Sequence, residues 1–165
     1  METSFKSVTL LLAIITMALS AGLFYAWTVS VIPGLKNMSN SSYLEAMQSI
    51  NKAILNPGFF AIFFGPIILL GISIILQYRT DVNLTFWLML AGSLCYLIGT
   101  VGVTVVGNVP MNDTLDLIEL KELNTEEINA IRAWYEEKWN YLNSVRTIFA
   151  VLGFTAIITA IFYAK

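Results

Sequence analysis

Four long apolar stretches alternate with polar segments along the chain. They cover about residues 8–33, 59–77, 84–106 and 145–163. A helix needs roughly 20 apolar residues to cross the hydrocarbon core of a bilayer, and each stretch is close to that length. The first is too long for the apolar region of a secretory signal, so we interpret it as a retained helix. The pattern predicts an all-α protein, a four-helix transmembrane bundle.

Two long polar connections, residues 34–58 and 107–144, join the first pair and the last pair of stretches. With four spans, both connections lie on one side of the membrane, where we expect them to form an outer cap. Helical spacing in the first connection predicts an amphipathic helix lying on the bundle. Its apolar positions are Leu44, Met47, Ile50 and Ile54.

The second connection ends in a helix that we expect to continue into the fourth span. Asn124 and Glu127 have the spacing of a capping box, which predicts where this helix begins. Neither Gly nor Pro interrupts residues 126–152. The fourth helix should therefore extend several turns beyond the membrane.

Composition supports the membrane class. Hydrophobic residues make up 57% of the chain, and its mean hydropathy is +0.73. A soluble domain of 165 residues could not bury this much apolar surface. The length fits a single integral membrane domain over residues 1–165. A net charge of −2 does not indicate a nucleic-acid partner, whereas membrane lipid surrounds such a chain on all sides.

The residue types also limit the chemistry. The chain contains no His, which removes the usual general base, zinc ligand and haem ligand. The single Cys95 cannot form an intramolecular disulfide. The carboxylates lie in segments that we expect to be solvated, so we predict no metal site and no cofactor.

The distribution of charge predicts an orientation. Residues 107–144 carry eight acidic and three basic residues. Arg79 lies in the short connection, and Lys6 and Lys165 lie near the termini. The positive-inside rule then places the termini and Arg79 in the cytoplasm and the long connections outside.

Small residues recur every four positions along the first span, at Ala18, Gly22, Ala26 and Ser30. Such a stripe lets another helix backbone approach closely. The partner helix could belong to the same bundle, or to a second copy of the chain in a homodimer.

Polar residues also recur every four positions along the third span, at Tyr96, Thr100, Thr104 and Asn108. They share one helix face, which in lipid must turn inward. The hydroxyls could bond to their own helix or to a neighbour. Alternatively, they could form a polar lining that leads to Asn108.

The sequence GNVPMND, residues 107–113, follows this face. Pro110 lacks an N–H and disfavours helix at the residue before it, so we expect the third helix to end near Asn108. Asn108 could then donate to the free carbonyls, and Asn112 could cap a new helix from Asp113. Two amides and a carboxylate at this point could also form a site.

Trp139, Asn143 and Arg146 lie on one face where the fourth helix enters the membrane. An Arg at this depth is costly unless it is paired. Asp113, Asp116 or the end of the third helix could pair it. Alternatively, its planar donors suit the oxygen of a carboxylate, phosphate or enolate.

The first connection could contribute to the same place. Gln48 and Asn51 lie three residues apart on the predicted amphipathic helix, and Trp27 lies near the outer end of the first span. A solvated face and an interfacial aromatic belt would explain them. If they face the bundle instead, they complete a polar and aromatic cleft for a small hydrophobic molecule.

Four motifs carry a resemblance: AGLFYAWTVSVIPGL, AMQSINKAILNP, GNVPMND and WNYLNSVRT. Over about residues 22–147, they resemble the large membrane family, a domain of unknown function, to which the anthrone oxygenases belong. The resemblance implies a four-span helical protein and, for some relatives, cofactor-free oxidation of an anthrone to an anthraquinone. A relative's mechanism that uses a His base cannot transfer. The motif positions in this chain are Pro33, Gln48, Asn51, Asn108, Pro110, Asn112, Trp139, Asn143 and Arg146.

On this hypothesis, Arg146 with Asn108 or Asn143 stabilises an oxyanion, and Asp113 accepts a proton. Aromatic side chains hold the flat ring. The predicted ligand-binding residues are Trp27, Gln48, Asn51, Tyr96, Asn112, Trp139 and Asn143.

Two other functions fit the same cleft. The chain could be a non-catalytic membrane module that holds a lipid, a quinone-like molecule or a partner protein. It could also be a small transporter, although it has no internal repeat and no acidic residue within a span.

Overall fold

The computed structural model describes residues 2–163, and that range contains helices and turns but no strand. Segments η1, η2 and η3 are π-helical, and η4 is a short 3-10 turn. The elements are α1 (Glu2–Ala26), η1 (Trp27–Val31), α2 (Ile32–Lys36), α3 (Asn40–Ala53), α4 (Pro57–Tyr78), α5 (Leu84–Leu94), η2 (Cys95–Gly102), η3 (Thr104–Asn108), α6 (Val109–Asp116), η4 (Leu120–Glu122) and α7 (Thr125–Phe162).

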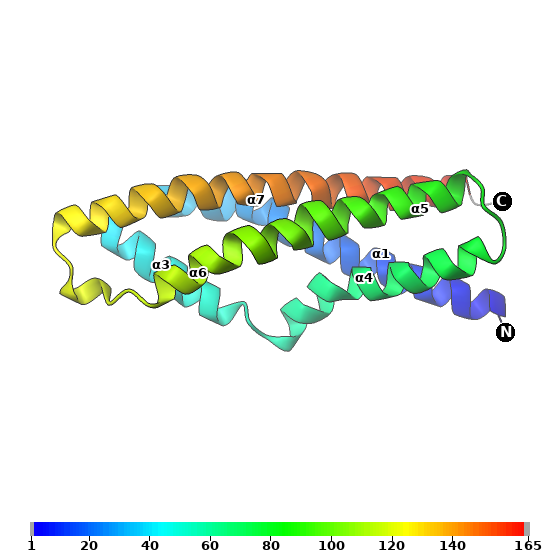
Figure 1. Ribbon diagram of the computed structural model, residues 1–165, viewed down its shortest axis with the longest axis horizontal. Helices are drawn as coiled ribbons and strands as arrows, with labels where there is room; N and C mark the ends of the chain where they lie inside the picture. Colours follow the sequence, from blue (N-terminus) through cyan, green and yellow to red (C-terminus); the bar gives the residue numbers. More distant parts are fainter. Residues whose placement is uncertain (1, 164–165) are drawn as a thin grey trace.

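The predicted four-helix bundle is confirmed (Figure 1). Within the described range, four continuous helices are long and apolar enough to cross a membrane: Phe5–Lys36, Pro57–Tyr78, Leu84–Asp116 and Thr125–Phe162. Both ends of the chain and the α4–α5 turn lie at one end, which we call the terminal end. The other end holds α3 and the α6–α7 connection, and we call it the cap end.

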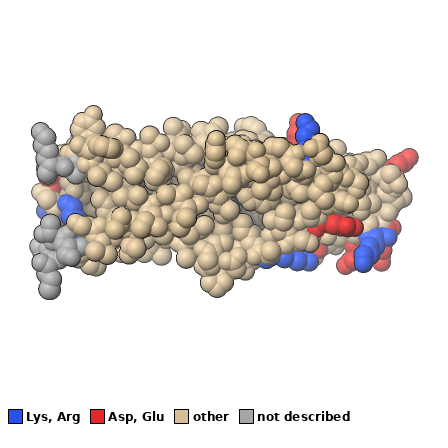
Figure 2. Space-filling model, turned by 180° about the vertical axis from the view of Figure 1, so that it is seen from behind, with Lys and Arg blue, Asp and Glu red and all other residues tan. Residues whose placement is uncertain are grey.

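Large apolar side chains cover the outside of the bundle. Ile68, Ile98 and Val106 are 62%, 66% and 79% exposed, respectively. Figure 2 shows the same property as a wide uncharged belt between charged groups at the two ends of the face in view. Apolar surface this extensive is typical of contact with lipid. The chain is therefore a membrane protein.

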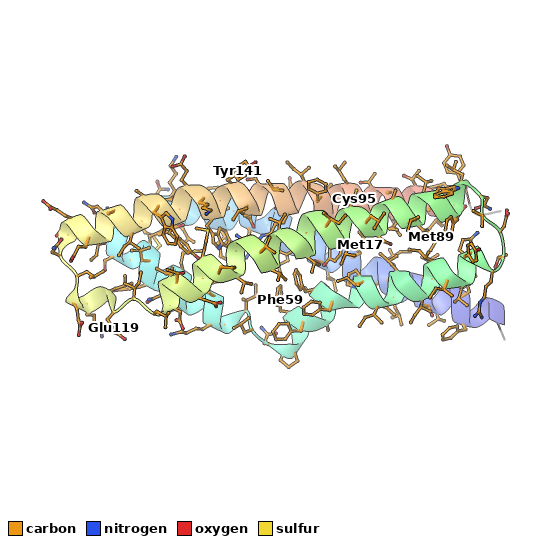
Figure 3. All side chains as sticks on the ribbon, viewed as in Figure 1. Met17, Phe59, Met89, Cys95, Glu119 and Tyr141 are labelled. Atoms are coloured by element: carbon orange, nitrogen blue, oxygen red, sulfur yellow. The ribbon has the colours of Figure 1, made fainter. Side chains whose placement is uncertain are left out.

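Close packing of α5 against α7 shapes the interior. The apolar core of the bundle includes Met17, Met89, Phe63 and Ile157, which are all buried (Figure 3). The two helices approach each other at glycines. A Cβ atom added to Gly92 would lie 2.8 Å from the carbonyl oxygen of Gly153. Small residues at such crossings allow the close backbone contact on which membrane helices rely.

The predicted amphipathic helix is confirmed as α3. Tyr43, Leu44 and Met47 are buried from its inner face, against a second apolar core at the cap end. Arg132 of α7 fixes the turn before α3. Its Nη1 donates to the Met38 carbonyl and to Asn40 Oδ1, each at 2.7 Å, and its Nε pairs with Glu136 at 2.8 Å.

The long fourth helix is also confirmed. Asn124 Oδ1 accepts from the Glu127 amide at 3.0 Å, and Glu127 Oε2 accepts from the Asn124 amide at 2.8 Å, which completes the predicted capping box. The helix α7 has 38 residues, so it is about 57 Å long at 1.5 Å per residue. Since a hydrocarbon core is about 30 Å thick, α7 extends well beyond it.

The prediction that the third helix ends near Asn108 is wrong. The helix continues through Pro110 to Asp116, so Asn112 lies inside it and does not cap a new one. The π-helical turn η3 explains the continuity. The Val109 amide bonds to the Thr104 carbonyl, five residues back, which shifts the hydrogen-bonding register just before the proline. The first helix uses the same device, with η1 just before Pro33. Wider turns of this kind accommodate a proline without ending a helix.

The small-residue stripe of the first helix faces outward. Gly22, Ala26 and Ser30 are exposed. A Cβ atom added to Gly22 would meet no atom of the described residues within 4 Å. These three residues therefore do not form a close helix contact within the bundle. The homodimer through this stripe stays a prediction.

Candidate functional site

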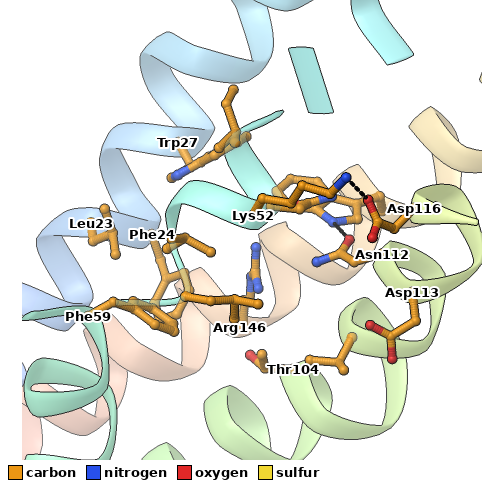
Figure 4. Close-up of a pocket in the computed structure, with 16 residues that line it drawn as sticks. Leu23, Phe24, Trp27, Lys52, Phe59, Thr104, Asn112, Asp113, Asp116 and Arg146 are labelled. Atoms are coloured by element: carbon orange, nitrogen blue, oxygen red, sulfur yellow. Dashed lines mark hydrogen bonds and ion pairs between the residues drawn. The ribbon is translucent and has the colours of Figure 1, made fainter. Parts of the chain in front are cut away.

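A cavity of about 180 Å³ lies at the cap end, where α1, α3, α6 and α7 meet the start of α4 (Figure 4). Apolar side chains form most of its wall, among them Leu23, Phe24, Trp27, Ile54, Leu55, Phe59 and Val109. Side chains with polar groups complete the wall: Asn51, Thr104, Asn112, Asp113, Trp139 and Arg146. An ion pair between Lys52 and Asp116, with 2.7 Å between Nζ and Oδ1, lies at the rim.

Arg146 is a buried charged residue of this cavity, and only 7% of its surface is exposed. Its Nε and Nη2 both donate to Asn143 Oδ1, at 3.1 and 3.0 Å. Asn143 in turn donates to Thr28 Oγ1 at 3.0 Å, so η1 supports the pair. The guanidinium carbon lies 4.7 Å from the centre of the Phe24 ring and 4.9 Å from that of Trp139. Both rings stabilise the cation and fix its plane.

Asp113 and Asp116, the two carboxylates predicted as possible partners of Arg146, do not pair with it. Asp116 pairs with Lys52, and Asp113 is exposed at the rim of the cavity. Within residues 2–163, Arg146 takes part in no ion pair. A buried cation without an anion is unfavourable. Its Nη1 makes no hydrogen bond with the described residues and remains available at the cavity.

Asn112 is held in one orientation by a directed chain of hydrogen bonds. Trp139 Nε1 lies 2.9 Å from one of its amide atoms, and an indole N–H can only donate. That atom is therefore the acceptor Oδ1. It also accepts from the Tyr135 hydroxyl at 2.7 Å, which itself accepts from Asn51 Nδ2 at 3.0 Å. The remaining donor, Asn112 Nδ2, is turned toward Arg146 (Figure 4).

Six of the ten predicted site residues line this cavity: Trp27, Asn51, Asn112, Asp113, Trp139 and Arg146. Trp27 and Trp139 pack together, with ring centres 5.0 Å apart. Asn143 lies behind Arg146 as its support. Gln48 serves the cap, since its Nε2 donates to the carbonyls of Leu115 and Ile118 at 2.8 and 3.0 Å.

Tyr96 lies deeper in the bundle, away from the other predicted residues. Its hydroxyl donates to the Phe63 carbonyl at 2.9 Å and lies 2.7 Å from Ser20 Oγ. Thr100 donates to the Arg146 carbonyl, and Thr104 to the Thr100 carbonyl. The predicted polar face thus turns inward, and its hydroxyls bond to helix backbone. Of these three residues, only Thr104 reaches the cavity.

Asn108 differs from the other predicted residues. It is fully buried, and neither its Oδ1 nor its Nδ2 has a hydrogen-bond partner among the described residues. Asn108 was predicted to donate to free carbonyls at the end of the third helix. It makes no such bond with the described residues, because the helix does not end there.

Sequence reasoning missed three residues that build the site. Phe24 packs on Arg146, Thr28 supports Asn143, and Tyr135 orients Asn112. Tyr135 had a signal, because it lies four residues before Trp139 on the same helix face. Phe24 and Thr28 had none, because only the packing of α1 against α7 brings them to Arg146.

The family of the chain follows from a comparison with family models. The model described as anthrone oxygenase matches residues 59–156, more than half of the chain. The chain belongs to the anthrone oxygenase family. A search of curated proteins and a search of solved structures gave no match.

The match to the anthrone oxygenase family includes the segments that carry Asn112, Trp139 and Arg146. The first helix and α3, with Trp27 and Asn51, precede it. The cavity therefore combines residues of the matched region with residues from outside it.

Proposed function

We propose that this chain is a membrane oxygenase that binds a flat, apolar ring ketone such as an anthrone in the cap-end cavity and oxidises it with dioxygen. The observation that carries the proposal is the guanidinium of Arg146, which is buried beside an apolar cavity without a carboxylate partner among the described residues. An enolate or phenolate oxygen would supply the missing anion. Membership of the anthrone oxygenase family agrees with that substrate class.

In this proposal, Arg146 Nη1 and Asn112 Nδ2 together bind the ketone oxygen. As the ring CH₂ loses a proton, negative charge develops on that oxygen. Donors fixed in advance stabilise such charge without reorganising. Asn143 and Trp139 hold the two donors in place and so act as positioning residues.

The proton acceptor in this proposal is Asp113. It is exposed at the rim and can return the proton to water. The enolate carbon then gives its electrons to dioxygen and forms a C–O bond. The resulting peroxide takes up a proton from Asp113 or water and becomes a hydroperoxide at the same ring carbon. Loss of water leaves a second carbonyl. One dioxygen is consumed, and one water is released for each quinone formed.

The size of the cavity suggests how such a molecule would bind. A cavity of about 150 Å³ can hold a benzene molecule, so about 180 Å³ encloses little more than one ring. The ring that carries the ketone would lie between Phe24, Trp27 and Phe59, and further rings would extend toward lipid.

The test uses purified protein in mild detergent, supplied with anthrone under air. We expect anthraquinone to form at least ten times faster than in protein-free detergent, with one dioxygen consumed per product. Arg146→Met should fall to the blank rate. Arg79→Met, which removes an exposed cation at the terminal end, should retain the wild-type rate.

Thermal unfolding of each variant separates loss of chemistry from loss of fold. Arg146→Lys serves as a second variant, because it keeps a cation but loses the planar fork. If anthrone quenches the tryptophan fluorescence of the wild-type protein but no dioxygen is consumed, the chain is a non-catalytic binding module. If it neither binds nor turns over anthrone, the proposal is wrong.

A further inference from the structure

A second cavity, of about 150 Å³, lies at the terminal end of the bundle. Helices α1, α4, α5 and α7 and the α4–α5 turn all contribute to it. Leu10, Met89 and Ile157 form part of an apolar wall. Lys6, which is half-buried, and Asp81, which is exposed, mark its opening.

Two deeply buried hydroxyls line this cavity. Ser73 is 1% exposed and Thr85 is 4% exposed. Across residues 2–163, neither Ser73 Oγ nor Thr85 Oγ1 has a hydrogen-bond partner. A buried hydroxyl left in this state costs free energy, and proteins pair nearly all of them.

Other hydroxyls on these helices show that such pairing is readily available. Thr9, Ser93 and Thr159 each donate to the carbonyl four residues earlier, at 2.8–2.9 Å. Thr85 lies at the second residue of α5, and the carbonyl four residues before it, that of Asp81, already accepts from Gln77 Nε2 at 3.1 Å. Ser73 lies inside α4, yet its hydroxyl does not bond to the α4 backbone. Both hydroxyls therefore remain available at one cavity.

The depth of the cavity indicates which part of a bilayer it meets. Ser73 lies five residues before the end of α4 at Tyr78, which corresponds to about 8 Å along the helix axis. The headgroup region adds roughly 5–8 Å to the hydrocarbon on each side of a bilayer. With the end of α4 at the outer edge of the headgroup region, Ser73 would lie at the level of phosphate and glycerol groups.

We propose that this cavity binds the phosphate-containing headgroup of a membrane phospholipid. The hydroxyls of Ser73 and Thr85 donate to its phosphoryl or ester oxygens, and the Lys6 ammonium neutralises the phosphate at the opening. Asp81 lies where it can accept from the amine of an ethanolamine headgroup. The exposed apolar side chain of Ile161, which lines the cavity, contacts the acyl chains.

Native mass spectrometry of the full chain in mild detergent tests the proposal. The probes are dioleoylphosphatidylethanolamine and dioleoylglycerol, which share acyl chains but differ in the phosphoethanolamine headgroup. We expect wild type to prefer the phospholipid at least tenfold. The double variant Ser73→Ala/Thr85→Val should lose this preference. The control Thr9→Val/Ser93→Ala removes hydroxyls that bond to their own helices, and it should keep the preference.

Thermal unfolding without added lipid keeps this test falsifiable. We expect Ser73→Ala/Thr85→Val to be at least as stable as wild type, because it removes buried hydroxyls that do not contribute a hydrogen bond. Added phospholipid should then raise the Tm of wild type more than that of the variant. Equal binding of the two lipids, or an unchanged preference in the variant, overturns the proposal. Binding of inorganic phosphate alone, with no lipid adduct, overturns its assignment to a lipid.

Discussion

At the scale of single residues, the direction of each hydrogen bond decides what the cap-end cavity can do. Trp139 can only donate, so it fixes Asn112 with its oxygen bound and its nitrogen toward Arg146. Asn143 uses its oxygen on Arg146 and its nitrogen on Thr28. Two amides thus act in different ways. One supports the cation, and the other presents a second donor beside it.

The substitution Asn112→Asp tests this arrangement. A carboxylate can still accept from Trp139 and Tyr135, but its second oxygen would face Arg146 and pair with it. We expect Tm to be unchanged or higher. Binding of 2-naphthoate, a flat aromatic anion, should weaken at least tenfold, whereas binding of neutral 2-naphthamide should not. Tryptophan fluorescence quenching measures both affinities.

The control is Asn140→Asp, which adds the same charge to α7 outside the residues that line the cavity. It should leave the affinity for 2-naphthoate within about twofold of wild type, since solvent screens a partly exposed charge outside the cavity. Equal weakening by both variants would mean that the charge of the whole chain, and not the Asn112 donor, controls binding.

At the scale of elements, close helix contacts and π-helical turns place the site. Glycines let α5 approach α7, and η1 and η3 carry the first and third helices through Pro33 and Pro110. Because the third helix continues, Asn112 lies on a rigid element opposite Trp139. A helix that ended at Asn108 would have left Asn112 in a connection.

Gly92→Ala should destabilise the protein by about 1–3 kcal/mol, the usual cost of overpacking. The added methyl group would lie 2.8 Å from the Gly153 carbonyl oxygen, and a backbone atom cannot move aside as a flexible side chain can. Thermal or denaturant unfolding in detergent measures the change.

Gly71→Ala is the matched control on α4. Its added Cβ would meet no atom of the described chain within 4 Å. Because Ala favours helix over Gly by about 0.5–1 kcal/mol, this variant should be as stable as wild type or slightly more stable. A similar loss of stability in both variants would show that helix contact at Gly92 is not the cause.

At the scale of the whole molecule, the bundle has two chemically different ends. The cap end carries most of the acidic residues, and the terminal end carries Lys6 and Arg79 (Figures 1 and 2). Length and hydropathy establish that the helices can span a membrane, but they do not assign the ends to its sides. The orientation with cytoplasmic termini therefore stays a prediction from the positive-inside rule.

Labelling of single cysteines tests the orientation. In a Cys95→Ser background, Lys121→Cys at the cap end should react with a membrane-impermeant maleimide in intact cells. Arg79→Cys at the terminal end should react only after permeabilisation. The reverse pattern would place the cap in the cytoplasm.

The outward stripe of small residues predicts a homodimer through the first helix. Gly22→Ile should lower the dimer fraction measured by light scattering in detergent, because the side chain keeps the helices apart. The fold of one chain should not change, since the added side chain points into open space. Val29→Ile, a change of one methylene at another exposed position of the same helix, is the control. A wild-type protein that is monomeric at all concentrations would contradict the prediction.

Neighbouring residues alone predict the spans, the amphipathic α3, the capped start of α7 and the grouping of Trp139, Asn143 and Arg146 on one face. These features follow from local periodicity and capping, which neighbouring residues encode. The other features depend on how the helices pack together. The third helix continues through Pro110, and Phe24 packs against Arg146. Tyr96 and Gln48 lie outside the site, where they bond to backbone carbonyls. Asn108, Ser73 and Thr85 are buried without hydrogen-bond partners in the described chain. The reason is physical. Which buried polar group meets which partner depends on how two helices cross, and that geometry is set by packing across the bundle rather than by spacing along one helix.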